Sequence, residues 1–345
     1  MVNEGLSKIN TLLGSFSTAQ NGIGLQATVI QADGSVFNST AGLANYKKSV
    51  PMSFDHHLHI GSITKMFTAA MVMQFIEQGR LSLEDTLDKW YKFPYAANIN
   101  LRQLLNHTSG IPDYTQDMRF YARTILFPKV PWQPEQLVEL IEGRPLQFDP
   151  GSEHFYSNTN YLLLGRILEK LVGNAYFVML REMIFSPLEL QDSYALDYPN
   201  DLLIANGYDE TIVNLGRRNT SNYRRALENG SYSAGAMIST STDVATFTHA
   251  LFNGQIVSLK TLDEMQVCMD ASDKYIYAQV GYGLGLRKLI LSGQELYGHT
   301  GAIPGFSGIS MHNPDRNTTI ALLCNLSIID YEALLDQLQT VVLET

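Results

Sequence analysis

The sequence predicts a mixed α/β (α+β) fold, in which an antiparallel sheet built from both ends of the chain is flanked by helices and a mainly helical region lies to one side. Two observations predict it. Helical and strand patterns alternate near both termini, whereas residues 81–230 carry helical patterns and few strand signals. No linker-like or low-complexity stretch divides the chain, so we expect one domain over residues 1–345, with its sheet part at 1–80 and 231–345.

The first 41 residues read as a helix followed by a hairpin. Apolar residues recur at helical spacing, with Asn3 available as a cap: Leu6, Ile9, Leu12 and Leu13. Gly24–Ile30 and Ser35–Ala41 then alternate as strands do, and Ala32-Asp33-Gly34 between them is a hairpin turn. These strands form the N-terminal share of the predicted sheet.

The far end of the chain reads as a run of short strands and a final helix. The expected strands are Gly283–Arg287, Gln294–Tyr297, Gly308–His312 and Thr318–Cys324. Their short connections imply antiparallel neighbours. An apolar stripe then follows a plausible N-cap at Asp330 and predicts the last helix: Tyr331, Leu334, Leu335, Leu338, Val341 and Val342.

The middle of the chain is predicted to be helical. The patterns Pro134–Glu142 and Asn160–Val172 end at Gly143 and Gly173, where a left-handed cap favours glycine. A ligand cleft is expected between this part and the sheet.

Composition narrows the possible partners. With 24 Lys and Arg against 34 Asp and Glu, the formal charge is −10, and the scattered cations disfavour a nucleic-acid partner. No apolar stretch approaches the roughly 20 residues that span a bilayer, so no transmembrane helix is expected. The first residues lack a signal-peptide pattern, which suits a cytoplasmic chain or a processed mature form. Cys268 and Cys324 are expected to be buried free thiols, although folding could also pair them.

Gly61-Ser62-Ile63-Thr64-Lys65 opens a run to Gln78 that is apolar nearly all round, which indicates a buried central helix closed by Gly79. Lys65 would lie one turn along from Ser62 on the same face, within reach of its hydroxyl. A serine needs such a base to act as a nucleophile at neutral pH, and the helix N-terminus offers N–H groups for an oxyanion. A helix cap followed by a solvated lysine gives the same short pattern, so the motif alone does not decide.

Two further motifs follow in order. Tyr156-Ser157-Asn158 precedes the helix expected from Asn160, and His299-Thr300-Gly301 ends a late strand. With Ser62-Ile-Thr-Lys65 they resemble the three signature elements of the family that unites class C β-lactamases, serine DD-carboxypeptidases, D-aminopeptidases and β-lactamase-like esterases. Residues 101–112, 156–165, 234–240 and 298–305 also resemble family segments, so the resemblance covers most of the chain. It implies a β-lactamase/transpeptidase-like fold and a serine hydrolase that acts through an acyl-enzyme.

The resemblance also implies roles for single residues. Ser62 is expected to be the nucleophile, with Lys65 and Tyr156 as proton-transfer groups, and which of the two is the base stays open. Asn158 would hold the substrate amide and orient Lys65. The end of the late strand that carries the third motif would supply the rest: His299, Thr300 and Gly301 for substrate binding, and the N–H of Ala302, with that of Ser62, for the oxyanion hole.

One departure from the family pattern is informative. Many members have Lys-Thr-Gly where this chain has His299-Thr300-Gly301, which replaces a fixed cation by a group expected to titrate near neutral pH. Soluble DD-carboxypeptidases with this histidine also resemble Tyr282–Arg287, where the arginine binds a terminal carboxylate. Arg287 is therefore a candidate carboxylate ligand, or equally a solvent-facing residue of an edge strand.

Weaker signals complete the picture. His56, His57 and His59 invite a metal site, but no carboxylate or cysteine cluster completes a ligand set, so no metal or cofactor is expected. No GxSxG elbow is present, which disfavours an α/β-hydrolase. Four aromatic residues wall the cleft or fill the core: Tyr114, Phe120, Tyr121 and Trp132.

The leading hypothesis is a DD-carboxypeptidase-like hydrolase that cleaves a peptide or amide next to a D-residue, with penicillins as covalent inhibitors. The same machinery would serve an esterase, a β-lactamase or a D-aminopeptidase. The alternative from another class is a catalytically idle scaffold or binding protein that kept the fold.

Overall fold

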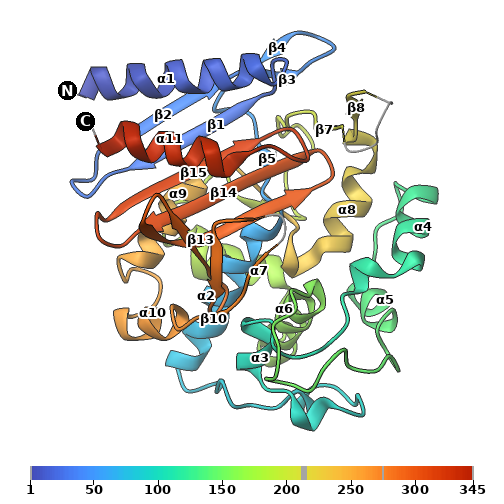
Figure 1. The fold of residues 1–345 in the computed structure, drawn as a ribbon. Helices are drawn as coiled ribbons and strands as arrows, with labels where there is room; N and C mark the ends of the chain where they lie inside the picture. Colours follow the sequence, from blue (N-terminus) through green and yellow to red (C-terminus); the bar gives the residue numbers. More distant parts are fainter. Residues whose placement is uncertain (1, 211–215, 274–275, 344–345) are drawn as a thin grey trace.

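The fold is built around an eight-stranded antiparallel sheet in a computed structural model that describes residues 2–210, 216–273 and 276–343 (Figure 1). The strand order is β10-β11-β12-β13-β14-β15-β1-β2. The bounds are β1 Leu25–Ile30, β2 Val36–Ala41, β10 Met269–Asp270, β11 Gln279–Tyr282, β12 Arg287–Leu291, β13 Gln294–Ile303, β14 Phe306–Asn313 and β15 Thr318–Cys324. The predicted mixed fold with a sheet from both chain ends is confirmed.

The two ends of the chain meet inside this sheet. β1 pairs with β15 so that Leu25 lies opposite Cys324 and Ile30 opposite Thr319. On one face, α1 (Val2–Ala19) and α11 (Tyr331–Leu343) lie side by side, as Figure 1 shows. Their apolar side chains and the sheet enclose one hydrophobic core.

The other face of the sheet carries the helices that lead to the site. α9 (Ser241–Phe252) packs on β1, β14 and β15, and α2 (Thr64–Glu77) contacts β13. The α2 helix is buried on nearly all sides except in its last turn, as the run that is apolar nearly all round predicts. The nearby α10 (Leu259–Met265) precedes β10.

The middle of the chain forms the helical part. Its helices are α3 Leu101–Leu105, α4 Met118–Leu126, α5 Pro134–Glu139, α6 Asn158–Val172, α7 Tyr176–Leu180 and α8 Arg224–Ser231. A π-helical turn, Arg181–Phe185, continues α7. Gly173 ends α6 in the left-handed conformation, as predicted.

Seven short strands of the described residues lie outside the large sheet. They are β3 Leu43–Asn45, β4 Val50–Pro51, β5 Leu58–His59, β6 Tyr194–Ala195, β7 Tyr208–Asp209, β8 Arg218–Asn219 and β9 Met237–Ser239. β5 and β6 both pair with β9, which ties the segment before the nucleophile to the helical part.

Some predicted boundaries are wrong. Gly283–Arg287 is mostly a tight turn between β11 and β12, in which the Gly283 N–H donates to the Leu286 carbonyl (2.8 Å). The backbone of Gly285 is left-handed there (φ +83°), so the glycines mark a turn and not a strand. Asn3 lies inside α1, which already includes Val2, and is not its cap. α6 begins at Asn158, two residues earlier than expected.

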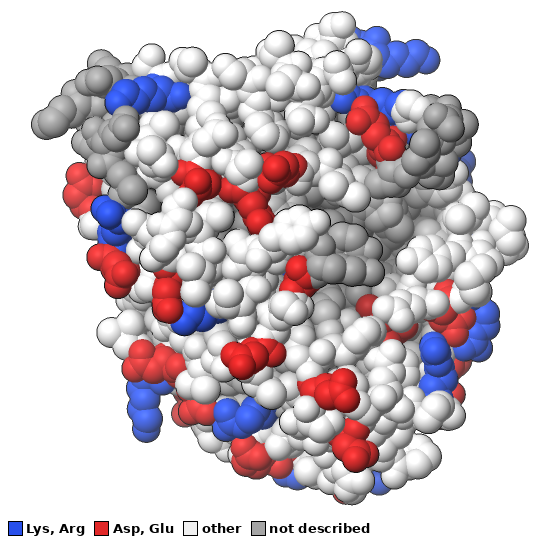
Figure 2. Space-filling model, in the orientation of Figure 1, with Lys and Arg blue, Asp and Glu red and all other residues white. Residues whose placement is uncertain are grey.

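Within the described residues, no helix is both long and apolar enough to cross a bilayer. Cys268 and Cys324 are unpaired, the first half-buried and the second fully buried. On the face drawn in Figure 2, Lys and Arg stand singly among Asp and Glu, without a continuous basic stripe.

Candidate active site

Ser62 lies in a single helical turn, Gly61–Ile63, that leads directly into α2. Gly61 is left-handed (φ +50°), and a Cβ atom on it would lie 2.8 Å from the Ala302 nitrogen. Only glycine permits this approach of the turn to β13. The close packing puts Ser62 beside the end of the strand on which Ala302 lies.

Lys65 is fully buried, and its amine is held by three acceptors. Nζ donates to Ser62 Oγ (3.0 Å), Asn158 Oδ1 (2.8 Å) and the Ala234 carbonyl (2.8 Å). Burial holds the pKa of Lys65 well below its usual range, and the carboxylate of Asp113 partly opposes this effect. The predicted contact between Ser62 and Lys65 is therefore present, and the lysine is placed to exchange a proton with the serine.

Tyr156 lies between two cations. Its ring centroid is 4.8 Å from Lys65 Nζ and 4.9 Å from Arg287 Cζ, and the His107 ring packs against it at 4.3 Å. The hydroxyl is buried and lies next to the side chains of Ser62 and Arg287. Burial raises the pKa of Tyr156 to about 12, against the opposing charge of Arg287. The group therefore stays protonated at neutral pH.

Asn158 joins the lysine to a carboxylate that the sequence analysis did not single out. Its Nδ2 donates to Asp113 Oδ2 (2.9 Å) while its Oδ1 accepts from Lys65. Asp113 comes from the loop after α3, directly after residues 101–112, which resemble a family segment. His107 was also missed, although it lies in the same resembling segment.

The strand β13 places its predicted residues beside the nucleophile. A Cβ on Gly301 would lie 1.9 Å from the Ile60 carbonyl, so glycine is required for the strand to approach this turn. Thr300 is buried, whereas Ala302 is exposed to the cleft. The backbone N–H groups of Ser62 and Ala302 thus belong to neighbouring walls of one cavity.

His299 is buried, and each of its two ring nitrogens has a hydrogen-bond partner. Nδ1 contacts the Thr300 carbonyl (2.5 Å), so it carries the proton, and Nε2 accepts from the Tyr282 hydroxyl (2.8 Å). Burial, with the charges of Arg287 and Lys65, holds the pKa of His299 well below its usual range. The expectation that His299 titrates near neutral pH is therefore wrong. The burial results from tertiary contacts, which the local sequence does not indicate.

Arg287 is also buried and already paired. Its guanidinium donates to Asp273 (3.1 Å) and Gln279. Only 5% of the residue is exposed, which rules out the solvent-facing interpretation. The guanidinium packs against the Tyr156 ring, and Arg287 is not one of the residues that line the cavity.

The cavity at Ser62 has a volume of about 240 Å³. Asn158, Ala234 and Ala302 line its polar end. Thr115 and Ser231 also line the cavity, together with six large or apolar side chains: Tyr114, Phe120, Tyr121, Leu227, Ile303 and Pro304. Trp132 packs against Phe120 from behind (5.4 Å between ring centroids) and is core. The surface in Figure 2 is hollowed between the sheet and α4, the side on which these residues lie.

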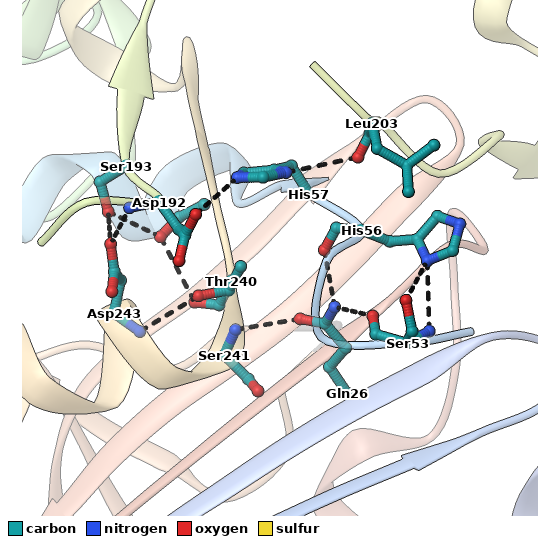
Figure 3. Close-up of polar contacts among 11 residues, drawn as sticks. Gln26, Ser53, His56, His57, Asp192, Ser193, Leu203, Thr240, Ser241 and Asp243 are labelled. Carbon is teal, nitrogen blue, oxygen red and sulfur yellow. Dashed lines mark hydrogen bonds and ion pairs between the residues drawn. The ribbon is translucent and has the colours of Figure 1, made fainter. Parts of the chain in front are cut away.

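The three histidines before Ser62 serve the fold, and Figure 3 shows two of them, His56 and His57. His56 contacts Ser53 (2.9 Å), and His57 faces the Leu203 carbonyl and Asp192 (3.3 Å each). His59 lies 3.3 Å from Glu228, and burial lowers its pKa to about 3. Among the residues that the structure describes, no three His, Cys, Asp or Glu side chains gather as metal ligands.

The chain is similar in fold and sequence to several known proteins. Among solved structures, the chain is similar to a D-amino acid amidase from Ochrobactrum anthropi SV3, with 26% identity, 98% of each chain covered and a TM-score of 0.89. It is also similar to a D-stereospecific amidohydrolase from a Streptomyces species (30% identity, 96% and 97% covered, TM-score 0.84). Penicillin-binding protein 4* of Bacillus subtilis is 28% identical over 86% of this chain and 67% of its own length.

The fold, the Ser62–Lys65 contact and these relatives define a serine hydrolase. The chain belongs to the beta-lactamase family, whose model matches residues 9–341. This assignment confirms the resemblance deduced from the three motifs.

Proposed function

We propose that this chain hydrolyses amide bonds next to D-residues through an acyl-enzyme on Ser62. The observation that carries the proposal is the contact between the buried Lys65 amine and Ser62 Oγ, because Ser62 also lines the cavity. A serine nucleophile needs a neighbouring group whose pKa allows it to accept a proton. Burial lowers the pKa of Lys65 in the required direction.

The opposite pKa shifts of two residues suggest their roles. Lys65, with its lowered pKa, takes the proton of Ser62, and Tyr156, which stays protonated, relays a proton to the leaving nitrogen. Ser62 Oγ bonds to the substrate carbonyl carbon, and the N–H groups of Ser62 and Ala302 stabilise the resulting oxyanion. The C–N bond then breaks, and water deacylates Ser62 by the reverse proton path.

The shape of the cavity suggests the acyl side of the substrate. Its apolar walls, which include Phe120, Tyr121 and Leu227, suit a large aliphatic or aromatic side chain. The amidase from Ochrobactrum was solved with D-phenylalanine and with L-phenylalanine amide. We therefore propose an apolar D-residue as the acyl donor, and penicillins as slow acylating agents of the same serine.

The contacts of Arg287 favour a second candidate function, a D-aminopeptidase or D-amino acid amidase, over a carboxypeptidase. Asp273 already supplies the carboxylate that pairs with the guanidinium. A free terminal carboxylate would have to compete with Asp273 for this guanidinium. This favours a D-aminopeptidase or D-amino acid amidase, whose substrates carry no terminal carboxylate at that point.

The test is a comparison of kcat/KM for matched substrates. D-phenylalanine amide should be hydrolysed at least 10²-fold faster than its L-enantiomer, and acyl-D-Ala-D-Ala no faster than its C-terminal amide. In Arg287→Ala both members of the second pair should slow alike. A large preference for the free acid that Arg287→Ala removes would restore the carboxypeptidase role, and equal rates for D- and L-amides would contradict the proposal.

A further inference from the structure

We propose that Asp113 is a positioning residue of this reaction, which orients Asn158 and, through it, the amine of Lys65. The inference rests on the proposed function, because it assumes that Lys65 exchanges a proton with Ser62. It adds a carboxylate that does not touch the reacting atoms but contacts Asn158, which in turn contacts Lys65.

The loop itself fixes the Asp113 carboxylate. Oδ1 accepts from the Thr115 N–H (2.9 Å) as the cap of the short turn Tyr114–Gln116. Oδ2 is thereby directed to Asn158 Nδ2 (2.9 Å). The residue is only 5% exposed, so water competes little for these bonds.

This bond decides which end of the Asn158 amide faces the lysine. With Nδ2 donating to Asp113, Oδ1 is presented to Lys65 Nζ (2.8 Å). A reversed amide would direct N–H donors at an ammonium group, which has only donors of its own. Asn158 Nδ2 also lies 3.4 Å from Thr115 Oγ1, so removing the carboxylate removes the shorter of the two contacts that oppose this reversal. The lysine would then lose one of its three acceptors.

The charge of Asp113 also acts on Lys65 directly. The lysine is surrounded by the rings of Tyr156 and Tyr161, by the buried His107 and His299, and by the more distant cation Arg287. Asp113 raises the pKa of Lys65, whereas Arg287 lowers it. Neutralising Asp113 should therefore move the ionisation of Lys65 to lower pH. The direction is the same whether Lys65 acts as the base or as a cation.

The experiment measures kcat, KM and their pH profiles for wild type, Asp113→Asn and Asp113→Glu with D-phenylalanine amide. In Asp113→Asn, kcat should fall on the order of 10²-fold with KM changed by less than about threefold. The limb of the kcat profile assigned to Lys65 should move down by about 0.5 pH unit or more. Asp113→Glu, which keeps the charge, should recover most of that shift.

Two controls separate the possible failures. Asp243→Asn removes another buried carboxylate, at the start of α9, and should leave the profile in place. Ser62→Ala must be inactive; if it is active, the proposed function itself fails. An unmoved profile in Asp113→Asn, with Ser62→Ala inactive, would overturn only the positioning role.

Asp113→Ser covers the case in which Asp113→Asn does not fold. Serine can still cap the Thr115 N–H but carries no charge and does not reach Asn158. It should show the same shift. If neither variant folds, the carboxylate is structural and the proposal is overturned.

Discussion

Lys65 is a buried amine whose three acceptors come from three different segments of the chain. Its contact with Ser62 was predictable, because residues three apart share one face of a helix. The bond between Asn158 and Asp113 was not, because it joins residues 45 positions apart in sequence. The family motif identified Asn158. No periodic sequence pattern identifies its partner Asp113, because only the tertiary fold brings the two residues together.

The burial of individual polar side chains was the feature that the sequence predicted least well. His299 and Arg287 were read as groups that could meet a substrate, yet each is enclosed and already bonded. Polar residues are mostly exposed, so a sequence pattern gives no warning of the exceptions. The aromatic residues Tyr156 and Tyr282, which enclose them, come from separate parts of the chain.

Lys65→Ala and Tyr156→Phe should each lower kcat by on the order of 10² or more, because each group moves a proton in the transition state. Both variants should retain near-wild-type KM. Steady-state kinetics on D-phenylalanine amide, with circular dichroism to check folding, measures this. A loss below about tenfold in either variant would mean that its role is misassigned.

At the scale of elements, the sequence located the helices and strands better than their ends. β13 is ten residues long although only Gln294–Tyr297 was expected, because its second half carries the site motif and lacks apolar alternation. Turn chemistry explains the misplaced strand at Gly283, whose Cβ would lie 2.1 Å from the Met265 carbonyl. Spacing alone does not reveal such an approach.

The contact between α8 and β5 contains a buried acid. Glu228 is 3% exposed, accepts from the Tyr198 hydroxyl (2.9 Å) and lies 3.3 Å from His59. Burial raises the pKa of Glu228 to about 7 from its ordinary 4.5. The folded state then holds a proton that the unfolded chain releases, so the free energy of unfolding falls as pH rises from about 4.5 to about 7.

Glu228→Gln should remove this pH dependence. Relative to wild type, its Tm should be higher by about 2–4 °C at pH 8 and not at pH 5, because the variant never buries the carboxylate charge. Thermal melts at the two pH values test it, with the exposed Glu182→Gln as the control. A variant that is destabilised equally at both pH values would contradict this account, because the effect would then not follow the ionisation of Glu228.

At the scale of the whole molecule, the sheet needs both ends of the chain. β1 lies between β2 and β15, and α1 packs beside α11 over the same face. We propose that residues 1–345 unfold as one unit, because the core under these two helices and the core around α2 share the central sheet. The helices α6 and α7 of the helical part contact α2, which in turn contacts β13 of the sheet. The α2 helix begins at Thr64, directly after the turn that holds Ser62.

Leu338→Ala tests this cooperativity. The side chain is fully buried in the core beneath α11, so its truncation should cost about 2–5 kcal/mol. Activity and helical signal should be lost together at the same lowered temperature, although Leu338 does not line the cavity around Ser62. The exposed Leu259→Ala is the matched control. Two separate transitions would instead indicate parts that unfold independently.

The most direct test of the central claim is a search for the acyl-enzyme on Ser62. Wild type and Ser62→Ala would be mixed with a D-phenylalanine ester, quenched in acid within the first turnovers and examined by intact-protein mass spectrometry and peptide mapping. The account predicts one acyl adduct in wild type, located on the Gly61–Lys65 peptide, and none in Ser62→Ala, which should remain folded. An adduct on another residue, or turnover by Ser62→Ala at the wild-type rate, would contradict it.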